Sequence, residues 1–203
     1  LGQTVDFPED GYHGEDIRRT MAEFISEQGD RYQDAPSDQR RPVLVEYALA
    51  KKIAACKETL KNFGVEYDVW FSEQSLHQAG AVQGVVDTLA QKGYIVEKDG
   101  AKWFTAGQFG AEKDEVLIRA NGVPTYYAAD IAYHKNKFDR GFQHVINIWG
   151  ADHHGHVARL KGAMDALGYD GSRLEVILMQ LVRLFQDGEI LRMSKRSGTY
   201  VTL

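Results

Sequence analysis

The sequence is poor in cysteine, in excess positive charge and in long apolar runs, and each shortage excludes a class of protein. One cysteine, Cys56, occurs among 203 residues, so no disulfide can form within the chain. Cys56 falls on the apolar side of a predicted helix, which favours a buried structural thiol over a nucleophile. The single thiol fits a reducing compartment, and we expect a cytoplasmic protein.

The net charge and the hydropathy argue against a basic nucleic-acid groove and against a membrane span. The formal net charge is −5, from 24 Lys and Arg against 29 Asp and Glu, which argues against a dominant basic groove for nucleic acid. No apolar stretch approaches the length of a membrane span and no secretory signal opens the chain, so no membrane contact is expected. The chain has no internal repeat. With 43% hydrophobic residues, it can bury a sizeable core.

Apolar periodicity predicts alternating helices and strands. A helix is expected over residues 15–28, a charged linker over 38–42 and an amphipathic helix over 45–63. Residues 65–71 alternate as a strand does, and residues 81–89 predict another helix. Asp99-Gly100 and Asn121-Gly122 each separate two apolar runs, as in β-hairpins. Two hairpins within an α/β alternation predict an inserted α+β subdomain.

A polar cluster follows the apolar run Val145–Trp149, which is typical of a buried strand in a parallel sheet. Gly150, Asp152, His153 and His156 therefore lie where a strand turns into a helix. Ligands of open α/β sheets bind at the carboxyl ends of strands, and Gly150 would let a sugar or base approach the backbone. Asp152 can accept hydrogen bonds from ribose, and a histidine can contact a base or phosphate. The alternative is that these residues only cap the helix.

Near the end of the chain, Met193, Ser194 and Lys195 lie on a polar loop with Ser197 and Gly198. A lysine on such a loop can place a compact positive charge against a triphosphate. Taken alone, the tripeptide indicates a solvated basic turn more than a nucleotide site.

Six segments together resemble the catalytic domain of class I aminoacyl-tRNA synthetases, and the arginyl-tRNA synthetase family most closely. They occur in the family's order: Gly11–Ile17, Phe63–Glu73, Gly93–Phe104, Pro124–His134, Trp149–Leu160 and Arg192–Leu203. The resemblance implies an α/β, Rossmann-like class I synthetase catalytic domain, incomplete, with the inserted α+β subdomain. The expected division is residues 1–64 in the catalytic domain, 65–126 in the insertion and 127–203 in the second half of the catalytic domain.

The resemblance also implies a reaction and a set of site residues. The reaction is ATP-dependent activation of arginine, with Mg²⁺ accompanying ATP, and transfer of the arginyl group to tRNA(Arg). Lys195 would be catalytic, and Tyr126 and Asp130 would bind arginine, since a carboxylate suits the planar guanidinium. Position alone favours a different role for Asp130, that of a cap in the first turn of a helix. The implied ATP-binding residues are Gly150, Asp152, His153, His156, Met193, Ser194 and Lys195. No metal site of the protein's own, no permanently bound cofactor and a monomeric state are expected.

The sequence departs from the family pattern in places. No His-x-Gly-His motif and no anticodon-binding domain are found, and the chain opens without methionine. We interpret the chain as a central fragment that is inactive in isolation. Arg192 occupies a position where the family often has lysine, and Tyr12, Gly14, Trp70 and Glu73 receive no chemical role. Asp152-His153-His154 leaves one alternative, a DHH-type manganese phosphoesterase.

Overall fold

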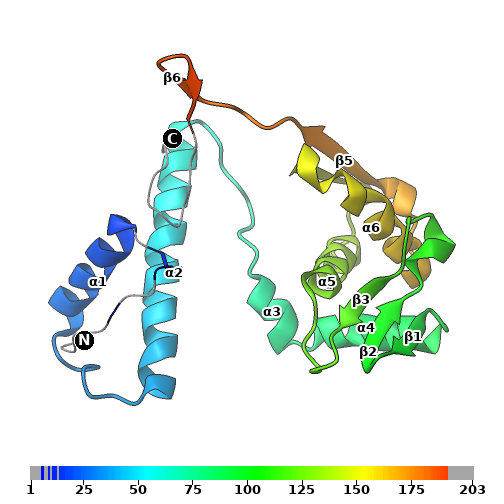
Figure 1. Cartoon of the computed structure of the whole chain (residues 1–203), viewed down its shortest axis with the longest axis horizontal. Helices are drawn as coiled ribbons and strands as arrows, with labels where there is room; N and C mark the ends of the chain where they lie inside the picture. The colour runs from blue at the N-terminus through cyan, green and yellow to red at the C-terminus, as the bar shows by residue number, and fades with distance from the viewer. Residues whose placement is uncertain (1–5, 7–8, 10, 13, 192–203) are drawn as a thin grey trace. The chain divides into compact units, whose positions relative to one another are not determined.

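The structure, a computed structural model, describes residues 6, 9, 11–12 and 14–191. They fall into two compact units, one drawn from Leu1–Val69 with Arg183–Leu203 and the other comprising Trp70–Val182. The elements, labelled in part in Figure 1, are α1 (Glu15–Gln28), α2 (Ser37–Asn62), α3 (Glu73–Gln78), α4 (Ala81–Gln91), β1 (Ile95–Lys98), β2 (Ala101–Phe104), η1 (Ala106–Phe109), β3 (Glu115–Ile118), α5 (Tyr126–Asp139), β4 (Val145–Gly150), η2 (Ala151–His153), α6 (His154–Leu167), η3 (Gly171–Arg173), β5 (Leu174–Met179), β6 (Phe185–Gln186) and β7 (Glu189–Ile190).

The first unit is built on the helix pair α1 and α2, which lie side by side (Figure 1). The predicted helix over 15–28 is confirmed. Phe24 is buried against the edge of the Tyr47 ring, with the ring centroids 5.0 Å apart. Lys51 adds ion pairs to Glu23 and Glu27, each at 3.2 Å. A small aromatic contact and exposed charge pairs therefore hold the two helices together.

The second helix corrects two predictions. It begins at Ser37, so the predicted charged linker over 38–42 is wrong. Asp38 lies in the first turn, where free backbone N–H groups stabilise a carboxylate, and Pro42 lies within the helix. Cys56 is exposed, so the predicted buried thiol is also wrong. Periodicity shows which side chains share a face but not which face another element covers. The helix α1 contacts a different face of α2, the one that carries Tyr47.

The predicted strand over residues 65–71 is wrong as well. Val65, Tyr67 and Val69 are exposed, and no described strand hydrogen-bonds to this segment. Alternation alone cannot make a strand, because the backbone N–H and C=O groups need a partner strand.

The second unit contains the antiparallel sheet β1-β2-β3. The predicted hairpin at Asp99-Gly100 is confirmed, because both residues have positive φ, 53° and 73°, as a tight two-residue turn requires. The predicted reversal at Asn121-Gly122 is present, but it forms only the isolated bridge Ile118↔Pro124. The chain enters α5 directly afterwards, since the Thr125 side chain accepts a hydrogen bond from the Ala128 N–H at the helix start.

The remaining part of this unit is a strand-helix-strand arrangement. The strands β4 and β5 pair in parallel over six residues, from Val145↔Leu174 to Gly150↔Met179, and α6 connects them. The predicted parallel strand is confirmed. The prediction that it is fully buried is wrong, since the described residues cover one face and leave Ile146 and Ile148 exposed. Parallel strands are normally covered on both faces.

The helices α4, α5 and α6 pack against one another and enclose one hydrophobic core (Figure 1). Its largest fully buried side chains include Phe104, Leu117, Ile131, Leu160 and Met164. Strands of the predicted insertion and helices of the predicted second half share this core. The shared core holds in place the side chains that line the cavities described below. The predicted boundaries at residues 64 and 126 stay a prediction. In the described part of the chain, no helix is long and apolar enough to cross a membrane.

Candidate active site at the carboxyl end of β4

Three cavities surround the point where β4 ends and α6 begins. The largest, about 580 Å³, is lined by Tyr126 and Asp130 together with residues of β2 and β3. A second, about 270 Å³, lies between α5 and β4 and shares Asp130, His153 and His156 with the first. The third, about 250 Å³, is lined by Asp152 to His156 and by the loop at Ala111 to Lys113. The predicted ATP and arginine residues that are described are thus brought to one place.

Asp152 and His153 extend into solvent from the short turn η2. Their side chains are 60% and 65% exposed, and His153 Nε2 lies 3.7 Å from Asp152 Oδ2. A Cβ atom at Gly150 would collide with the Asp152 carboxylate. We had expected Gly150 to make room for a ligand, and its observed effect is to make room for the side chain of Asp152.

Asp130 lies in the second turn of α5, not in its first. The cap at this end of the helix is Thr125, so Asp130 is not the helix cap. Tyr126, one turn earlier, is 82% exposed on the wall of the largest cavity. Residues four apart lie on one face of a helix, and α5 therefore presents the phenol and the carboxylate together.

His156 contacts Asp130 directly, with His156 Nε2 3.0 Å from Asp130 Oδ2. The imidazole is 11% exposed and packs between the rings of Tyr127 and Trp149, at centroid distances of 5.3 and 5.4 Å. Of the predicted ATP-binding residues that the structure describes, His156 is therefore the one that lies against the predicted arginine-binding carboxylate.

Sequence reasoning missed two charged residues that extend this contact. Arg159 Nε donates to His156 Nδ1 at 2.6 Å, and Arg159 Nη1 donates to Glu115 Oε1 at 2.5 Å. Arg159 could have been found from its i,i+3 spacing to His156 on α6. Glu115 comes from β3, 44 residues away in sequence, and no local pattern indicates the contact.

A second missed group lines the cavity of about 270 Å³ between α5 and β4. His134 Nδ1 donates to the Asp130 carbonyl oxygen at 2.7 Å, and Asn147 Nδ2 donates to His134 Nε2 at 2.6 Å. Lys137 Nζ donates to Asn147 Oδ1 at 2.9 Å. Burial, and then the charge of Lys137, lower the pKa of His134 to about 4. Burial, and then the charge of Arg140, lower the pKa of Lys137 to about 8. This group links α5 to β4 one helical turn after Asp130.

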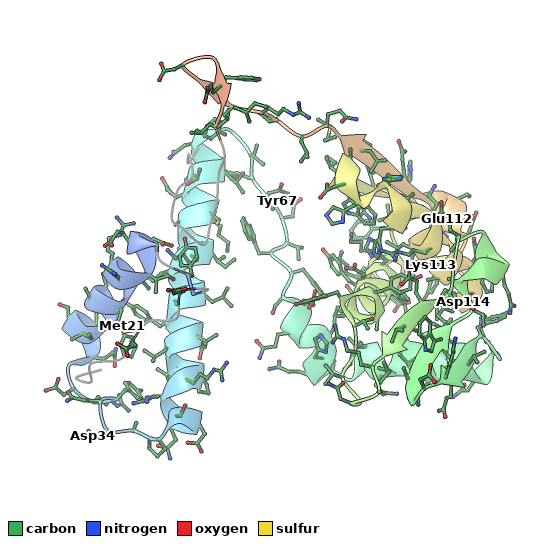
Figure 2. All side chains as sticks on the ribbon, viewed as in Figure 1. Met21, Asp34, Tyr67, Glu112, Lys113 and Asp114 are labelled. Atoms are coloured by element: carbon green, nitrogen blue, oxygen red, sulfur yellow. The ribbon has the colours of Figure 1, made fainter. Side chains whose placement is uncertain are left out.

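The loop between η1 and β3 closes the site from the side of the predicted insertion. Figure 2 shows Glu112, Lys113 and Asp114 on this loop, and Lys113 lines two of the cavities. Asp114 Oδ1 accepts a hydrogen bond from the Gly107 N–H at 3.1 Å, which ties the loop together. The loop therefore brings a positive charge to the site next to His153.

The predicted clamp residues Met193, Ser194 and Lys195, and with them Arg192, lie outside the described residues. Over the residues that are described, no three His, Cys, Asp or Glu side chains come together in a way that could hold a metal ion. The manganese phosphoesterase alternative thus gains no support.

Comparison with known proteins adds independent findings. The family model described as tRNA synthetases class I (R), catalytic domain, matches residues 28–203. The chain is 65% identical to the arginine–tRNA ligase of Moorella thermoacetica and 63% identical to that of Heliobacterium modesticaldum, in each case over all of this chain and 36% of the relative. The chain therefore spans about a third of the length of these relatives, and none of these findings favours a phosphoesterase.

Solved structures agree with this family match. A putative arginyl-tRNA synthetase from Campylobacter jejuni superimposes with a TM-score of 0.83 at 39% sequence identity, covering 94% of this chain and 41% of that one. The arginyl-tRNA synthetase of Thermus thermophilus gives a TM-score of 0.56 at 17% identity, covering 85% of this chain and 40% of that one, which supports the fold alone.

Proposed function

Since the chain belongs to the family of class I (R) tRNA synthetase catalytic domains, we propose that the full-length protein activates arginine with ATP and transfers it to tRNA(Arg). The observation that carries the proposal is the position of Asp130. Its carboxylate lies on the wall of the 580 Å³ cavity beside Tyr126, next to the turn that follows β4. A carboxylate in a partly enclosed site is the group that best binds a guanidinium, through paired charge-assisted hydrogen bonds.

The first step of the proposed reaction activates the amino acid. A carboxylate oxygen of arginine forms a bond to the α-phosphorus of ATP. The bond from that phosphorus to the bridging oxygen breaks, and pyrophosphate leaves with the electron pair. The protein contributes position and electrostatic stabilisation of the phosphate charge. Mg²⁺ enters as part of the ATP substrate.

The turn after β4 supplies the proposed nucleotide contacts. Asp152, exposed at the end of the strand, would accept hydrogen bonds from the ribose hydroxyls, and Gly150 leaves space for that carboxylate. His153 would complete the adenosine side of the site. His156, whose two ring nitrogens already bond Asp130 and Arg159, would border that side by packing and not by a polar contact. Met193 and Ser194 would border the adenine and phosphates, and Lys195 would neutralise the β- and γ-phosphates as the catalytic lysine.

The second step moves the arginyl group to RNA. The terminal ribose hydroxyl of tRNA(Arg) forms a bond to the carbonyl carbon of arginyl-adenylate and gives up its proton to the phosphate of the leaving AMP, which departs with the electron pair of the broken C–O bond. We further propose that the protein works as a monomer in the cytoplasm, without a permanently bound cofactor or a metal site of its own.

The test is arginine-dependent exchange of pyrophosphate into ATP by the full-length protein, with tRNA(Arg) present. Citrulline is the matched control substrate, because it has nearly the shape of arginine but no charge for Asp130 to bind. We expect exchange with arginine and at least a hundredfold less with citrulline or lysine. Equal exchange with citrulline would contradict the role of Asp130, and no exchange with any amino acid would contradict the proposed function.

A binding experiment addresses the nucleotide site alone. Calorimetry with ATP and Mg²⁺ on the 203-residue chain would compare the wild type with Asp152→Ala and Lys195→Ala. Millimolar or tighter binding that either substitution weakens would support the proposed ATP contacts. Binding that neither substitution changes would contradict them.

A further inference from the structure

A continuous row of four charged or polar side chains crosses the site from the predicted insertion to Asp130. It begins with Glu115 on β3, passes through Arg159 and His156 on α6, and ends at Asp130 on α5. The joining distances are 2.5 Å from Arg159 Nη1 to Glu115 Oε1, 2.6 Å from Arg159 Nε to His156 Nδ1, and 3.0 Å from His156 Nε2 to Asp130 Oδ2. Three separate elements therefore meet through hydrogen bonds with normal or short lengths.

The donors and acceptors in this row allow only one arrangement of protons. Arginine is always protonated and has no acceptor, so Arg159 Nε must donate and His156 Nδ1 must accept. The ring proton of His156 then lies on Nε2, from which it is donated to Asp130 Oδ2. A proton on Nδ1 would face the Arg159 N–H and break the row. Arg159 thus selects the tautomer of His156.

Partial burial and contacts with Tyr127 hold the side chain of Arg159 in place. The side chains of Arg159 and Glu115 are 28% and 19% exposed. Tyr127 donates its hydroxyl hydrogen to the Arg159 carbonyl oxygen at 2.6 Å, and the Arg159 guanidinium carbon lies 5.5 Å from the centre of the Tyr127 ring. A planar guanidinium held by a cation–π contact and by two directed hydrogen bonds cannot be replaced by the single nitrogen of lysine.

We propose that Arg159 and Glu115 are positioning residues for arginine recognition, acting through His156 on Asp130. His156 occupies Oδ2 of the carboxylate and fixes its orientation. Oδ1, to which no described side chain donates a hydrogen bond, is left to the guanidinium of the substrate. The proposal rests on the proposed function, and it assigns β3 of the predicted insertion a part in amino-acid binding.

The experiment uses the full-length protein and measures arginine-dependent ATP–pyrophosphate exchange with tRNA(Arg) present. Arg159→Met removes both donors, Arg159→Lys keeps the charge and the stem, and Glu115→Gln keeps an acceptor. Lys161→Met is the matched control, because it removes the same charge from the same helix two residues away. We expect Arg159→Met and Arg159→Lys to raise the KM for arginine at least tenfold with the KM for ATP within twofold. Glu115→Gln should raise the arginine KM by about threefold, and Lys161→Met should leave both unchanged.

A spectroscopic measurement separates positioning from a general loss of structure. ¹⁵N spectra of histidine-labelled protein, with the His156 signals assigned by His156→Gln, should show Nδ1 unprotonated and Nε2 protonated. In Arg159→Met we expect a mixture of both tautomers while the melting temperature stays close to that of Lys161→Met.

Three results would overturn the proposal. They are an arginine KM within twofold of wild type in both Arg159 variants, an equal rise in the KM for ATP, or an unchanged His156 tautomer in Arg159→Met. Failure of the proposed function is a different result, in which the wild-type protein itself shows no arginine-dependent exchange.

Discussion

At the scale of single residues, the site depends on side chains whose orientation their neighbours fix. His134 and His156 each have one ring nitrogen that donates and one that accepts, so each has one defined tautomer. Both contact Asp130, His134 through the backbone carbonyl and His156 through the carboxylate. His156 therefore holds the carboxylate before any substrate arrives, which lowers the ordering cost of binding.

Asp130→Asn tests the central residue. Asparagine has the same shape and can still accept from His156, so the fold should persist while the charge is lost. We expect the KM for arginine to rise at least tenfold in the exchange assay and the KM for ATP to stay within twofold. Asp139→Asn is the control, since it makes the same change on the same helix at an exposed pair with Lys135. An unchanged arginine KM in Asp130→Asn would mean that the carboxylate has only a structural role.

Because His134 is buried, we expect the free energy of unfolding to depend on pH. Burial lowers its folded-state pKa from 6.5 to about 4, so below pH 6.5 the unfolded chain binds a proton that the folded chain does not. Stability is therefore lost as the pH falls from 6.5 to about 4, by about 1.4 kcal/mol for each pH unit at most.

The measurement is the urea unfolding free energy of the wild type and of His134→Gln at several values between pH 7 and 4. Carboxylates titrate in both proteins, so the informative quantity is the difference in slope. The wild type should lose stability more steeply. Parallel curves would show that His134 titrates in the same way in both states.

At the scale of elements, the distance between η1 of the predicted insertion and α6 depends on one close contact. Gly162 lies on α6 where η1 approaches, and a Cβ there would come within 2.7 Å of Phe109 Cβ and 2.8 Å of the Phe109 carbonyl oxygen. Backbone cannot move aside as a flexible side chain can. The approach of η1 therefore depends on the absence of a side chain at position 162.

Gly162→Ala should destabilise the protein by about 1–3 kcal/mol, because it forces η1 away from the helix. Gly84→Ala is the matched control. Gly84 lies within α4 with no atom within 4 Å of an added Cβ, so alanine there should stabilise by about 0.5–1 kcal/mol. Chemical denaturation gives both values. A neutral Gly162→Ala would mean that η1 adapts without cost.

Several helices and turns predicted from the sequence were confirmed. Each of these predictions depends only on residues that are close together in the sequence. The first helix and the Asp99-Gly100 hairpin follow from side-chain periodicity and from a turn that requires positive φ. The failures have a common cause. Residues 65–71 alternate but have no described partner strand, and α2 is amphipathic but α1 covers a different face.

At the scale of the whole molecule, the two compact units differ in how much they bury. Trp70–Val182 contains all residues of the hydrophobic core cluster. The 26-residue helix α2 buries none of its residues, and Val45 and Leu49 are more than half exposed. Because burial of apolar surface supplies most of the stability of a helix within a protein, the two units should differ in local stability.

Hydrogen exchange on the 203-residue chain checks this difference. We expect the central amides of α2 to exchange at least a hundredfold faster than those of α5 and α6, which lie in the core. The reason is that α2 can open without exposing a packed interior. Equal protection of α2 and α6 would contradict the expectation and would indicate a covering of α2 that the described contacts do not provide.

The sequence alone determined the family, most of the helices, the Asp99-Gly100 hairpin and the position of Gly150, Asp152, His153 and His156 at the end of a parallel strand. These depend on patterns within short stretches, where local backbone preferences and side-chain spacing act. Only the tertiary structure decided that His156 contacts Asp130, that Arg159 and Glu115 continue that contact, and that His134, Asn147 and Lys137 bond to one another beside the same cavity. Glu115 and Arg159 are 44 residues apart, and such contacts arise from how helices and strands pack, which no local pattern specifies.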